Sequence, residues 1–470
     1  MSRTSPLPGS LPPNFVFGAA TSAFQIEGGR NADGKADSIW DTFCDLPGAT
    51  ADGDSGTVAC DHYHRSSEDL QIMQTLGLDA YRFSIAWARI MPDGRTVNSR
   101  GLDFYERLID GLLERGIEPW PTLYHWDLPQ SLQDQGGWVS RDSVDWFTDY
   151  AEAVQNRLGA RVKRYTTFNE PWCAAFLGHA AGVHAPGMQN PSGAIAAAHH
   201  MLLSHGRVAQ LLHSTDPDMQ VGITLNLSVI DPLTPSDEQA ARMIDGQINR
   251  FFLDPLFRGE YPADVRGMLA EWWPSDLVQD DDLSAISAPL DFLGVNYYRG
   301  EVVSLTPPPE DETLSPPTDR PPASPYLRDE GIHFHTVLPE RTSLGWVIQP
   351  EGLTRLLKRI STEYAKPSDT PLFVTENGAA FNDVVDHDGQ VHDEIRVRYV
   401  EDHIGAVFDA RNSGVDVRGY FYWSLLDNFE WDWGYSQRFG IVHVDYRTQA
   451  RTIKQSGLRY AEIIAQSHVG

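Results

Sequence analysis

The chain has 470 residues, of which 41% are hydrophobic and 22% charged, and its formal net charge is −28. This composition is typical of a globular protein with a large core, and the acidic balance argues against nucleic acid because phosphates would be repelled. Cys44, Cys60 and Cys173 show no C-x-x-C spacing, which argues against a disulfide framework and against a zinc site.

The sequence predicts neither a secretory signal nor a membrane span. The first residues, MSRTSPLPGSLPPNF, lack the apolar stretch of a secretory signal. Residues 171–206 contain no Asp, Glu, Lys or Arg, but Pro, Gly and His interrupt them too often for a membrane span. We therefore predict a cytoplasmic protein with no membrane partner, and its oligomeric state stays open.

Short segments rich in β-branched and aromatic residues recur along the chain and predict strands. Helical-period apolar residues separate them, most clearly at 102–113, 146–158 and 395–408, and a glycine follows each of these segments. The predicted strands, in chain order, are residues 15–24, 80–87, 118–125, 164–168, 221–227, 291–297, 371–375 and 417–423.

Eight strands that alternate with helices predict an α/β fold, a single (β/α)8 TIM barrel. Near-continuous apolar strands fit a parallel sheet that is covered by helices. The doubly wound alternative requires a G-x-G-x-x-G after a strand, and none of these strands has one. No repeat or linker divides the chain, so we predict one domain over residues 1–470, with its core at about 15–465. Residues 300–345, rich in Pro, Asp and Glu, are expected to be neither helix nor strand but one of the long βα loops over the mouth.

Barrel enzymes carry their chemistry at the carboxyl ends of the strands. The side chains expected there are amides, carboxylates, one guanidinium, one imidazole and aromatic rings, which together suit a sugar with hydroxyl edges and apolar faces. They show no metal-ligand spacing, no phosphate-binding glycine loop and no nucleophilic serine turn, so no metal or cofactor is expected. These residues are Gln25, Arg82, His125, Trp126, Asn169, Glu170, Asn296, Tyr298, Glu376, Trp423, Glu430 and Trp431.

Two of these residues, Glu170 and Glu376, each stand beside an asparagine where a strand ends. A glutamate at a strand end is more often a solvated cap than a catalyst, but a pair of carboxyls can carry out glycoside hydrolysis. One is protonated and assists the leaving oxygen, while the other is ionised and attacks or activates water. Proton donation supplies only ~10²–10⁴-fold, so a covalent step and a preorganised site are needed as well.

Eight motifs in order, "QIEG", "YRFSIAW", "YHWDLP", "TFNEPW", "GVNYY", "LGWVIQP", "FVTENG" and "WSLLDNFEWDWGYSQRFGIVHVD", run over nearly the whole chain. With them the chain resembles glycoside hydrolase family 1, the β-glucosidase family. The resemblance implies a retaining hydrolase of β-D-glucosides such as aryl glucosides and cello-oligosaccharides, with a place in cellulose and polysaccharide degradation. It also implies that Glu170 is the acid/base and Glu376 the nucleophile.

The resemblance further implies roles for the residues around the two glutamates. Arg82 and Tyr298 would contact the nucleophile and favour its ionised form, and Asn169 would bind the sugar 2-hydroxyl. Desolvation beside Trp172, together with the charge of Glu376, would keep Glu170 protonated. The remaining sugar-binding residues would be Gln25, His125, Trp126, Asn296, Trp423, Glu430, Trp431 and Phe439, and the aglycone side would be lined by Trp172, Leu177, His184 and Trp346.

Two alternative functions are considered. A catalytically silent sugar-binding barrel would lack one carboxylate, as in relatives that have Gln at the acid/base position, but this chain has both glutamates. A 6-phospho-β-glycosidase would carry a small hydroxyl residue and a nearby Lys where Glu430 and Trp431 stand here. The choice among glucose, galactose and fucose stays open, as does the natural aglycone.

Other conspicuous residues are expected to be structural. His62, His64 and the pair His199–His200 have no acidic or Cys partner at ligand spacing, so they are not expected to bind a metal. Cys173 is expected to be a small buried hydrophobic residue. Core or rim positions are expected for Trp138, Trp146, Trp272 and Trp273.

Overall fold

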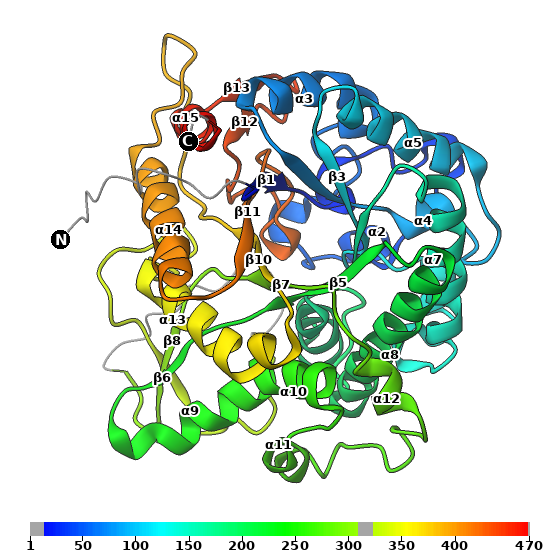
Figure 1. Cartoon of the computed structure of the whole chain (residues 1–470), viewed down its shortest axis with the longest axis vertical. Helices are drawn as coiled ribbons and strands as arrows, with labels where there is room; N and C mark the ends of the chain where they lie inside the picture. Colours follow the sequence, from blue (N-terminus) through cyan, green and yellow to red (C-terminus); the bar gives the residue numbers. More distant parts are fainter. Residues whose placement is uncertain (1–13, 309–322, 469–470) are drawn as a thin grey trace.

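The computed structural model describes residues 14–308 and 323–468. Its centre is a closed barrel of eight parallel strands that neighbour one another in chain order, and helices surround the barrel (Figure 1). The predicted (β/α)8 barrel is therefore confirmed. The barrel strands are β1 (Val16–Ala20), β2 (Ala80–Ser84), β3 (Glu118–Tyr124), β4 (Arg164–Asn169), β5 (Gln220–Asn226), β7 (Phe292–Asn296), β10 (Leu372–Asn377) and β11 (Val417–Trp423).

The helices predicted at 102–113, 146–158 and 395–408 are confirmed as α5 (Ser99–Leu113), α7 (Ser143–Leu158) and α14 (Glu394–Asn412), each somewhat longer than its apolar pattern. The helices around the barrel and over its ends are α1 (Ala23–Ile26), α2 (Ile39–Cys44), α3 (His62–Leu76), α4 (Trp87–Ile90), α5 (Ser99–Leu113), α6 (Gln130–Gln133), α7 (Ser143–Leu158), α8 (Pro191–Thr215), α9 (Glu238–Asp245), α10 (Phe251–Arg258), α11 (Ala263–Met268), α12 (Asp282–Ile286), α13 (Pro350–Ile360), α14 (Glu394–Asn412) and α15 (Gln455–Ser467).

Two predicted strands are wrong at their carboxyl ends. The segment 15–24 ends as strand at Ala20 and then forms α1, and the segment 80–87 ends as strand at Ser84 before α4. Side chains bind the backbone at these places, since the Ala23 N–H donates to Ser84 Oγ at 2.6 Å and the Ala86 N–H donates to Tyr105 Oη at 2.7 Å. Apolar composition does not distinguish a buried helical turn from a continuing strand, which explains both errors.

Four aromatic side chains fill the interior of the barrel. Trp120 meets Phe292, Phe373 and Phe421 edge to face, at centroid distances of 5.1, 5.0 and 5.0 Å. Each ring comes from a different strand, and side chains that interdigitate in this way make the barrel interior a packed core. Gly18 on β1 leaves room for this layer, because a Cβ there would lie 2.4 Å from the ring of Phe421.

The loops over the mouth contain regular structure that the sequence did not predict. The ends of segment 300–345 form strands β8 (Glu301–Ser304) and β9 (His333–His335), which pair with each other, and β8 also pairs with β6 (Ile230–Pro232). The expectation that this segment contains no strand is therefore wrong, because short pairing partners lie in a separate loop. Residues 309–322 at its centre, like the amino-terminal residues 1–13, lie outside the described residues. One further two-stranded pair is β12 (Val442–Val444) with β13 (Arg451–Ile453).

The uncharged segment 171–206 folds as two helices over the barrel. A π-helix, Cys173–Ala181, follows β4, and α8 begins after Asn190, whose side chain accepts a hydrogen bond from the Gly193 N–H. Within residues 14–308 and 323–468, no helix combines the length and apolar character needed to cross a membrane.

Candidate active site

Glu376 lies on β10 at the mouth of the barrel, where two donors from other strands hold its carboxylate. Arg82 of β2 donates from Nη1 to Oε1 at 2.6 Å. Tyr298, just after β7, donates from its hydroxyl to Oε2 at 2.7 Å. Both the guanidinium and the carboxylate are buried. The arrangement fixes the carboxylate and favours its ionised form.

Glu170 follows β4 and is joined to Glu376 through two asparagines. Asn296 Nδ2 donates to Glu170 Oε1 at 2.8 Å and to Asn169 Oδ1 at 3.0 Å. The same Asn169 Oδ1 accepts from Arg82 Nη2 at 2.6 Å. Arg82 therefore contacts both Glu376 and the amide that precedes Glu170, and a continuous set of hydrogen bonds connects the two carboxyl groups.

The two carboxyl groups differ in electrostatic environment. Burial, followed by the charge of Glu376, raises the pKa of Glu170 to about 8. Burial also raises the pKa of Glu376, but the Arg82 charge and the Tyr298 hydroxyl offset part of that rise. One proton shared by the pair therefore resides on Glu170 near neutral pH, which gives a protonated acid opposite an ionised carboxylate.

The wall expected to face the sugar is built from the ends of four barrel strands and the loop after β11. His125 stacks against Trp423 with a centroid distance of 5.6 Å, and its Nε2 pairs with Asn169 Nδ2 at 3.1 Å. Gln25 Nε2 donates to Glu430 Oε2 at 3.4 Å. Burial raises the pKa of Glu430 well above its ordinary value, and the Asp432 charge adds to this rise. Among the described residues, buried His125 Nδ1 has no partner, so it is available to a ligand hydroxyl.

Three site residues have left-handed backbone conformations that non-glycine residues seldom adopt. Trp126, Glu170 and Trp431 have φ angles of 78°, 50° and 52°. Their surroundings hold them in place, since Trp126 Nε1 donates to Asn169 O at 2.9 Å and its ring lies 4.5 Å from that of Trp431. Such conformations cost about 1–3 kcal/mol each and concentrate at functional sites.

The side expected to face the leaving group is lined by aromatic and apolar side chains. Trp346 is partly buried and lies edge to face with Tyr298 at 5.6 Å, while Phe439 lies 6.1 Å from both rings. Trp172 packs on Tyr326 at 5.4 Å, and its buried Nε1 has no partner among the described residues. Leu177 lies partly buried on the π-helix. The structure thus places these predicted residues on loops and at the π-helix rather than on barrel strands.

His184, also predicted for the leaving-group side, lies between three indoles. Its ring centroid is 5.2 Å from that of Trp40, 5.5 Å from that of Trp126 and 6.3 Å from that of Trp431. Its Nε2 pairs with Asp432 Oδ1 at 3.3 Å. Asp432 adds a carboxylate to this side and was not predicted from the sequence, where its only signal was its place beside Trp431.

Cys173 also differs from its expected role as a simple hydrophobic residue. It is buried, but its Sγ lies 3.3 Å from Glu170 Oε2 and makes a hydrogen bond. Its position three residues after Glu170 was the only signal in the sequence. Tyr326, which packs on Trp172, is a second contact residue that the sequence analysis missed, because it follows the Pro-rich stretch.

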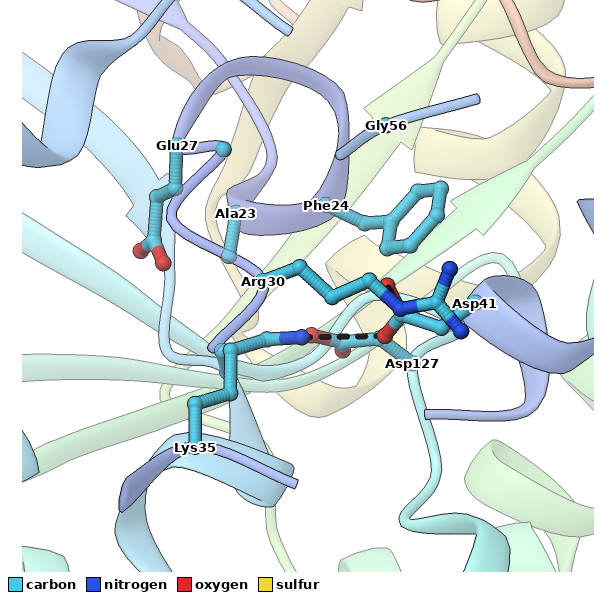
Figure 2. Close-up of a pocket in the computed structure, with 10 residues that line it drawn as sticks. Ala23, Phe24, Glu27, Arg30, Lys35, Asp41, Gly56 and Asp127 are labelled. Carbon is cyan, nitrogen blue, oxygen red and sulfur yellow. Dashed lines mark hydrogen bonds and ion pairs between the residues drawn. The ribbon is translucent and has the colours of Figure 1, made fainter. Parts of the chain in front are cut away.

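A small cavity is lined by residues that adjoin Gln25 and His125 in sequence, among them Glu27 and Asp127 (Figure 2). Lys35 points into it but is paired with Asp41, at 2.9 Å. Burial, followed by the charge of Glu27, raises the pKa of Asp127 to about 8. The carboxyl of Asp127 is therefore largely uncharged near neutral pH, and nothing here extends the predicted sugar site.

The histidines that were not expected to bind a metal have hydrogen-bond partners within the protein. His62 pairs with Asp69 at 2.8 Å, His64 with Asp61 at 2.6 Å, His199 with Tyr261 and Asp282, and His200 with the Trp138 carbonyl.

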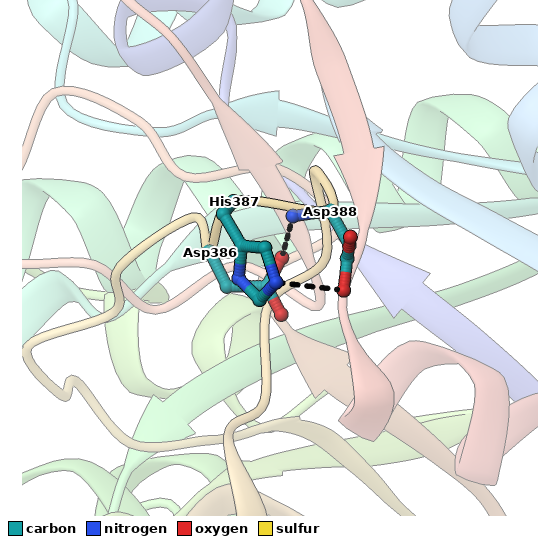
Figure 3. Close-up of side chains that lie close together, drawn as sticks. All are labelled: Asp386, His387 and Asp388. Carbon is teal, nitrogen blue, oxygen red and sulfur yellow. Dashed lines mark hydrogen bonds and ion pairs between the residues drawn. The ribbon is translucent and has the colours of Figure 1, made fainter.

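Within the described ranges, one cluster brings three potential metal ligands together, Asp386, His387 and Asp388 (Figure 3). It sits on an exposed turn, where Asp386 Oδ1 accepts the backbone N–H groups of Asp388 and Gln390. Exposed acidic groups of this kind are turn formers, and the absence of a metal stays a prediction.

Comparison with known proteins agrees with the geometry. The model of glycosyl hydrolase family 1 matches residues 7–469, so the chain belongs to this family of retaining O-glycoside hydrolases and the predicted resemblance is confirmed. Two relatives are β-glucosidase A of Thermotoga maritima, 45% identical over 97% of both chains, and the 1,4-β-D-glucan glucohydrolase of Thermotoga neapolitana, 44% identical over 97% of this chain and 98% of the relative. The crystal structure of the psychrophilic β-glucosidase BglU from Micrococcus antarcticus superposes with a TM-score of 0.94 at 50% identity, covering 97% of this chain and 98% of that one. The prediction of an enzyme of the β-glucosidase type is confirmed by these relatives.

Proposed function

We propose that this glycoside hydrolase removes terminal non-reducing β-D-glucosyl residues from aryl β-glucosides and cello-oligosaccharides by double displacement through a covalent glycosyl-enzyme. The contrast between the two carboxyl groups carries the proposal. Glu376 is held by Arg82 and Tyr298 at 2.6 and 2.7 Å, whereas burial raises the pKa of Glu170 to about 8. These are the protonation states that a nucleophile and an acid require.

In the first step, Glu376 attacks the anomeric carbon and a new bond forms between that carbon and the carboxylate. The bond from the anomeric carbon to the leaving oxygen breaks, and this oxygen takes the proton from Glu170. Asn169 is oriented by Arg82 and Asn296. Its amide binds the 2-hydroxyl and strengthens that hydrogen bond as charge develops at the anomeric carbon.

In the second step, water attacks the anomeric carbon and Glu170, now ionised, takes a proton from that water. The ester bond to Glu376 breaks and the sugar leaves with its original configuration. Loss of the Glu376 charge in the intermediate removes a contribution that raises the pKa of Glu170, so the carboxylate form that acts as base becomes more stable.

The walls around the carboxyl groups suit an unmodified hexose. Trp423 supplies a face for the apolar side of the ring. The hydroxyl groups are bound by Gln25, His125, Trp126, Asn296, Tyr298, Glu430 and Trp431, with Phe439 closing the wall.

On the leaving-group side, Trp172, Leu177, His184 and Trp346 accept either an aryl group or a second glucose. The glucan glucohydrolase among the relatives supports cello-oligosaccharides as substrates.

A 6-phospho-β-glycosidase is the second candidate, and the surroundings of Glu430 argue against it. Glu430 and Asp432 place two carboxyl groups in the same loop. The nearest lysine along the chain, Lys454, is bound at 2.6 Å by Asp427 and also pairs with Asp383. A sugar phosphate would therefore lie beside two carboxyl groups, and the paired lysine would not compensate its charge in a partly dry site.

The experiment that tests the proposal is a substrate panel combined with product stereochemistry. We expect the largest kcat/KM for β-D-glucosides, with β-D-galactosides and β-D-fucosides lower, cellobiose hydrolysed, and 6-phosphoglucosides poor. Proton NMR should show the β-anomer as the first product. An α-anomer at early times, or a preference for the phosphorylated sugar, would overturn the mechanism or the substrate class respectively.

We also propose that residues 15–465 act as one catalytic domain. Helix α15, near the end of the chain, contacts the first and the last strand of the barrel, β1 and β11, which pair with each other. The Tyr460 hydroxyl donates to Gly18 O of β1 at 2.8 Å and lies 3.3 Å from Tyr420 O of β11. The cytoplasmic location and the absence of nucleic-acid partners stay predictions.

A further inference from the structure

Cys173 places its thiol against the carboxyl group of Glu170. The Cys173 N–H donates to the Glu170 carbonyl at 3.0 Å in the turn that opens the π-helix. This turn, entered from the left-handed conformation of Glu170, directs the Cys173 side chain back over the glutamate. Its Sγ lies 3.3 Å from Oε2, and both side chains are buried.

The contact falls on the oxygen that exchanges the proton. Glu170 Oε1 already accepts a hydrogen bond from the amide of Asn296 at 2.8 Å, so the acidic proton of Glu170 resides on Oε2. Burial raises the pKa of the Cys173 thiol well above its ordinary value, and the charge of Glu170 adds to this rise. The sulfur therefore keeps its hydrogen throughout the catalytic cycle and is a donor whenever Glu170 is ionised.

We propose that Cys173 is a positioning residue for the acid/base: its S–H donates to Oε2 of ionised Glu170 and stabilises the carboxylate that must take a proton from water in the second step. This inference rests on the proposed role of Glu170. The thiol works together with Asn296, so that each carboxylate oxygen has one protein donor. Neither donor is charged, and the carboxyl group can therefore still regain a proton at the end of each cycle.

Removal of the S–H donor has a defined effect on the pH dependence. Because the thiol stabilises the ionised form, its loss raises the pKa of Glu170. The alkaline limb of kcat/KM, which reports the acid in the free enzyme, then moves to higher pH. The acidic limb of kcat for a substrate limited by the second step also moves to higher pH, because the base ionises later.

The test is a set of pH profiles for the full-length enzyme with 4-nitrophenyl β-D-glucoside. Cys173→Ala should shift the alkaline limb of kcat/KM upward by about half a pH unit or more. Cys173→Ser restores a donor and should return the limb to the wild-type position or below. Cys44→Ala removes another buried thiol, on α2, and serves as the matched control with an unshifted profile. Cys173→Val, which fills the space without a donor, is measured as a second deletion in case the alanine variant does not fold.

The outcomes separate this inference from the function on which it rests. If Glu170→Ala retains the alkaline limb, Glu170 is not the acid and the proposed mechanism fails. If Glu170→Ala loses the limb but Cys173→Ala and Cys173→Val leave it in place, the proposed mechanism stands and the role of Cys173 is refuted. A shift that the serine variant does not reverse would show that cavity formation, not the donor, caused the change, and this would also refute the role.

Discussion

Glu376 and Glu170 have the same side chain but lie in regions that are built differently. Glu376 belongs to strand β10, and its two oxygens are bound by a guanidinium from β2 and by a phenol that follows β7. Glu170 follows its strand in a left-handed conformation, opens a π-helix, and is bound by an amide and a thiol. The charged donor on one side and the neutral donors on the other divide one reaction between two identical residues.

The walls of the site beside Glu376 and beside Glu170 also differ. The side of Glu376 is formed largely by barrel strand ends, whose positions are fixed by the aromatic layer beneath them. The side of Glu170 includes the π-helix and aromatic rings such as Trp172 and Tyr326, and the indole N–H of Trp172 has no partner among the described residues. We infer that the glucosyl unit is recognised by the rigid region and that the leaving group is accepted by the more adaptable one.

The largest expected effect follows from removing the nucleophile. Glu376→Gln keeps the shape but cannot form the ester, so kcat for any β-glucoside should fall on the order of 10⁴–10⁶-fold. Glu152→Gln, on the exposed surface of α7, is the matched control and should retain full activity. Substantial activity of Glu376→Gln, after exclusion of deamidated enzyme by mass spectrometry, would contradict the assignment.

Loss of the acid should depend on the leaving group. Glu170→Ala should reduce kcat/KM for cellobiose by roughly 10²–10⁴-fold, because a sugar alkoxide leaves only with a proton. An aryl glucoside with an acidic phenol needs little protonation, so its first step should be affected far less. Equal losses for both substrates would show that Glu170 has another role. The different surroundings of Glu170 and Glu376 would then not explain which of them is the acid.

A substitution at Glu430 tests how the glucosyl unit is recognised. Glu430→Ser removes an acceptor for sugar hydroxyls and should lower kcat/KM for the β-glucoside roughly 100-fold. It should also raise kcat/KM for the 6-phosphoglucoside relative to the glucoside, since a carboxyl group that cannot compensate the phosphate charge is replaced by a hydroxyl donor. Glu152→Ser is the control. An unchanged ratio of the two substrates would remove Glu430 from the recognition of the sugar 6-position.

The smallest expected effect concerns the phenol on the nucleophile. Tyr298 donates to Glu376 Oε2 and lowers its pKa relative to burial alone. Tyr298→Phe should therefore raise the pKa of Glu376, and the acidic limb of kcat/KM should move upward by about half to one pH unit. Activity well above that limb should fall about tenfold. A limb that stays in place would assign the ionised state of Glu376 to Arg82 alone.

The barrel was predictable from the sequence because its strands are short apolar segments separated by helical-period segments. The candidate site was predictable because the polar and aromatic residues at the strand ends together suit a sugar. Contacts between distant loops were not predictable. Strand β8 pairs with β6 on one side and with β9 on the other, and the approach of Cys173 to Glu170 depends on a left-handed residue followed by a π-helix. No periodicity in the sequence reports such geometry, because it is decided by tertiary packing.

The division of roles between the two glutamates is tested most directly by trapping the covalent intermediate. A 2-deoxy-2-fluoroglucoside with an activated leaving group should inactivate both the wild-type enzyme and Glu170→Gln, since its first step needs little protonation. Peptide mass spectrometry should then find the fluoroglucosyl group on Glu376 in both proteins. A label on Glu170 or on any other residue of the wild-type enzyme would contradict the account.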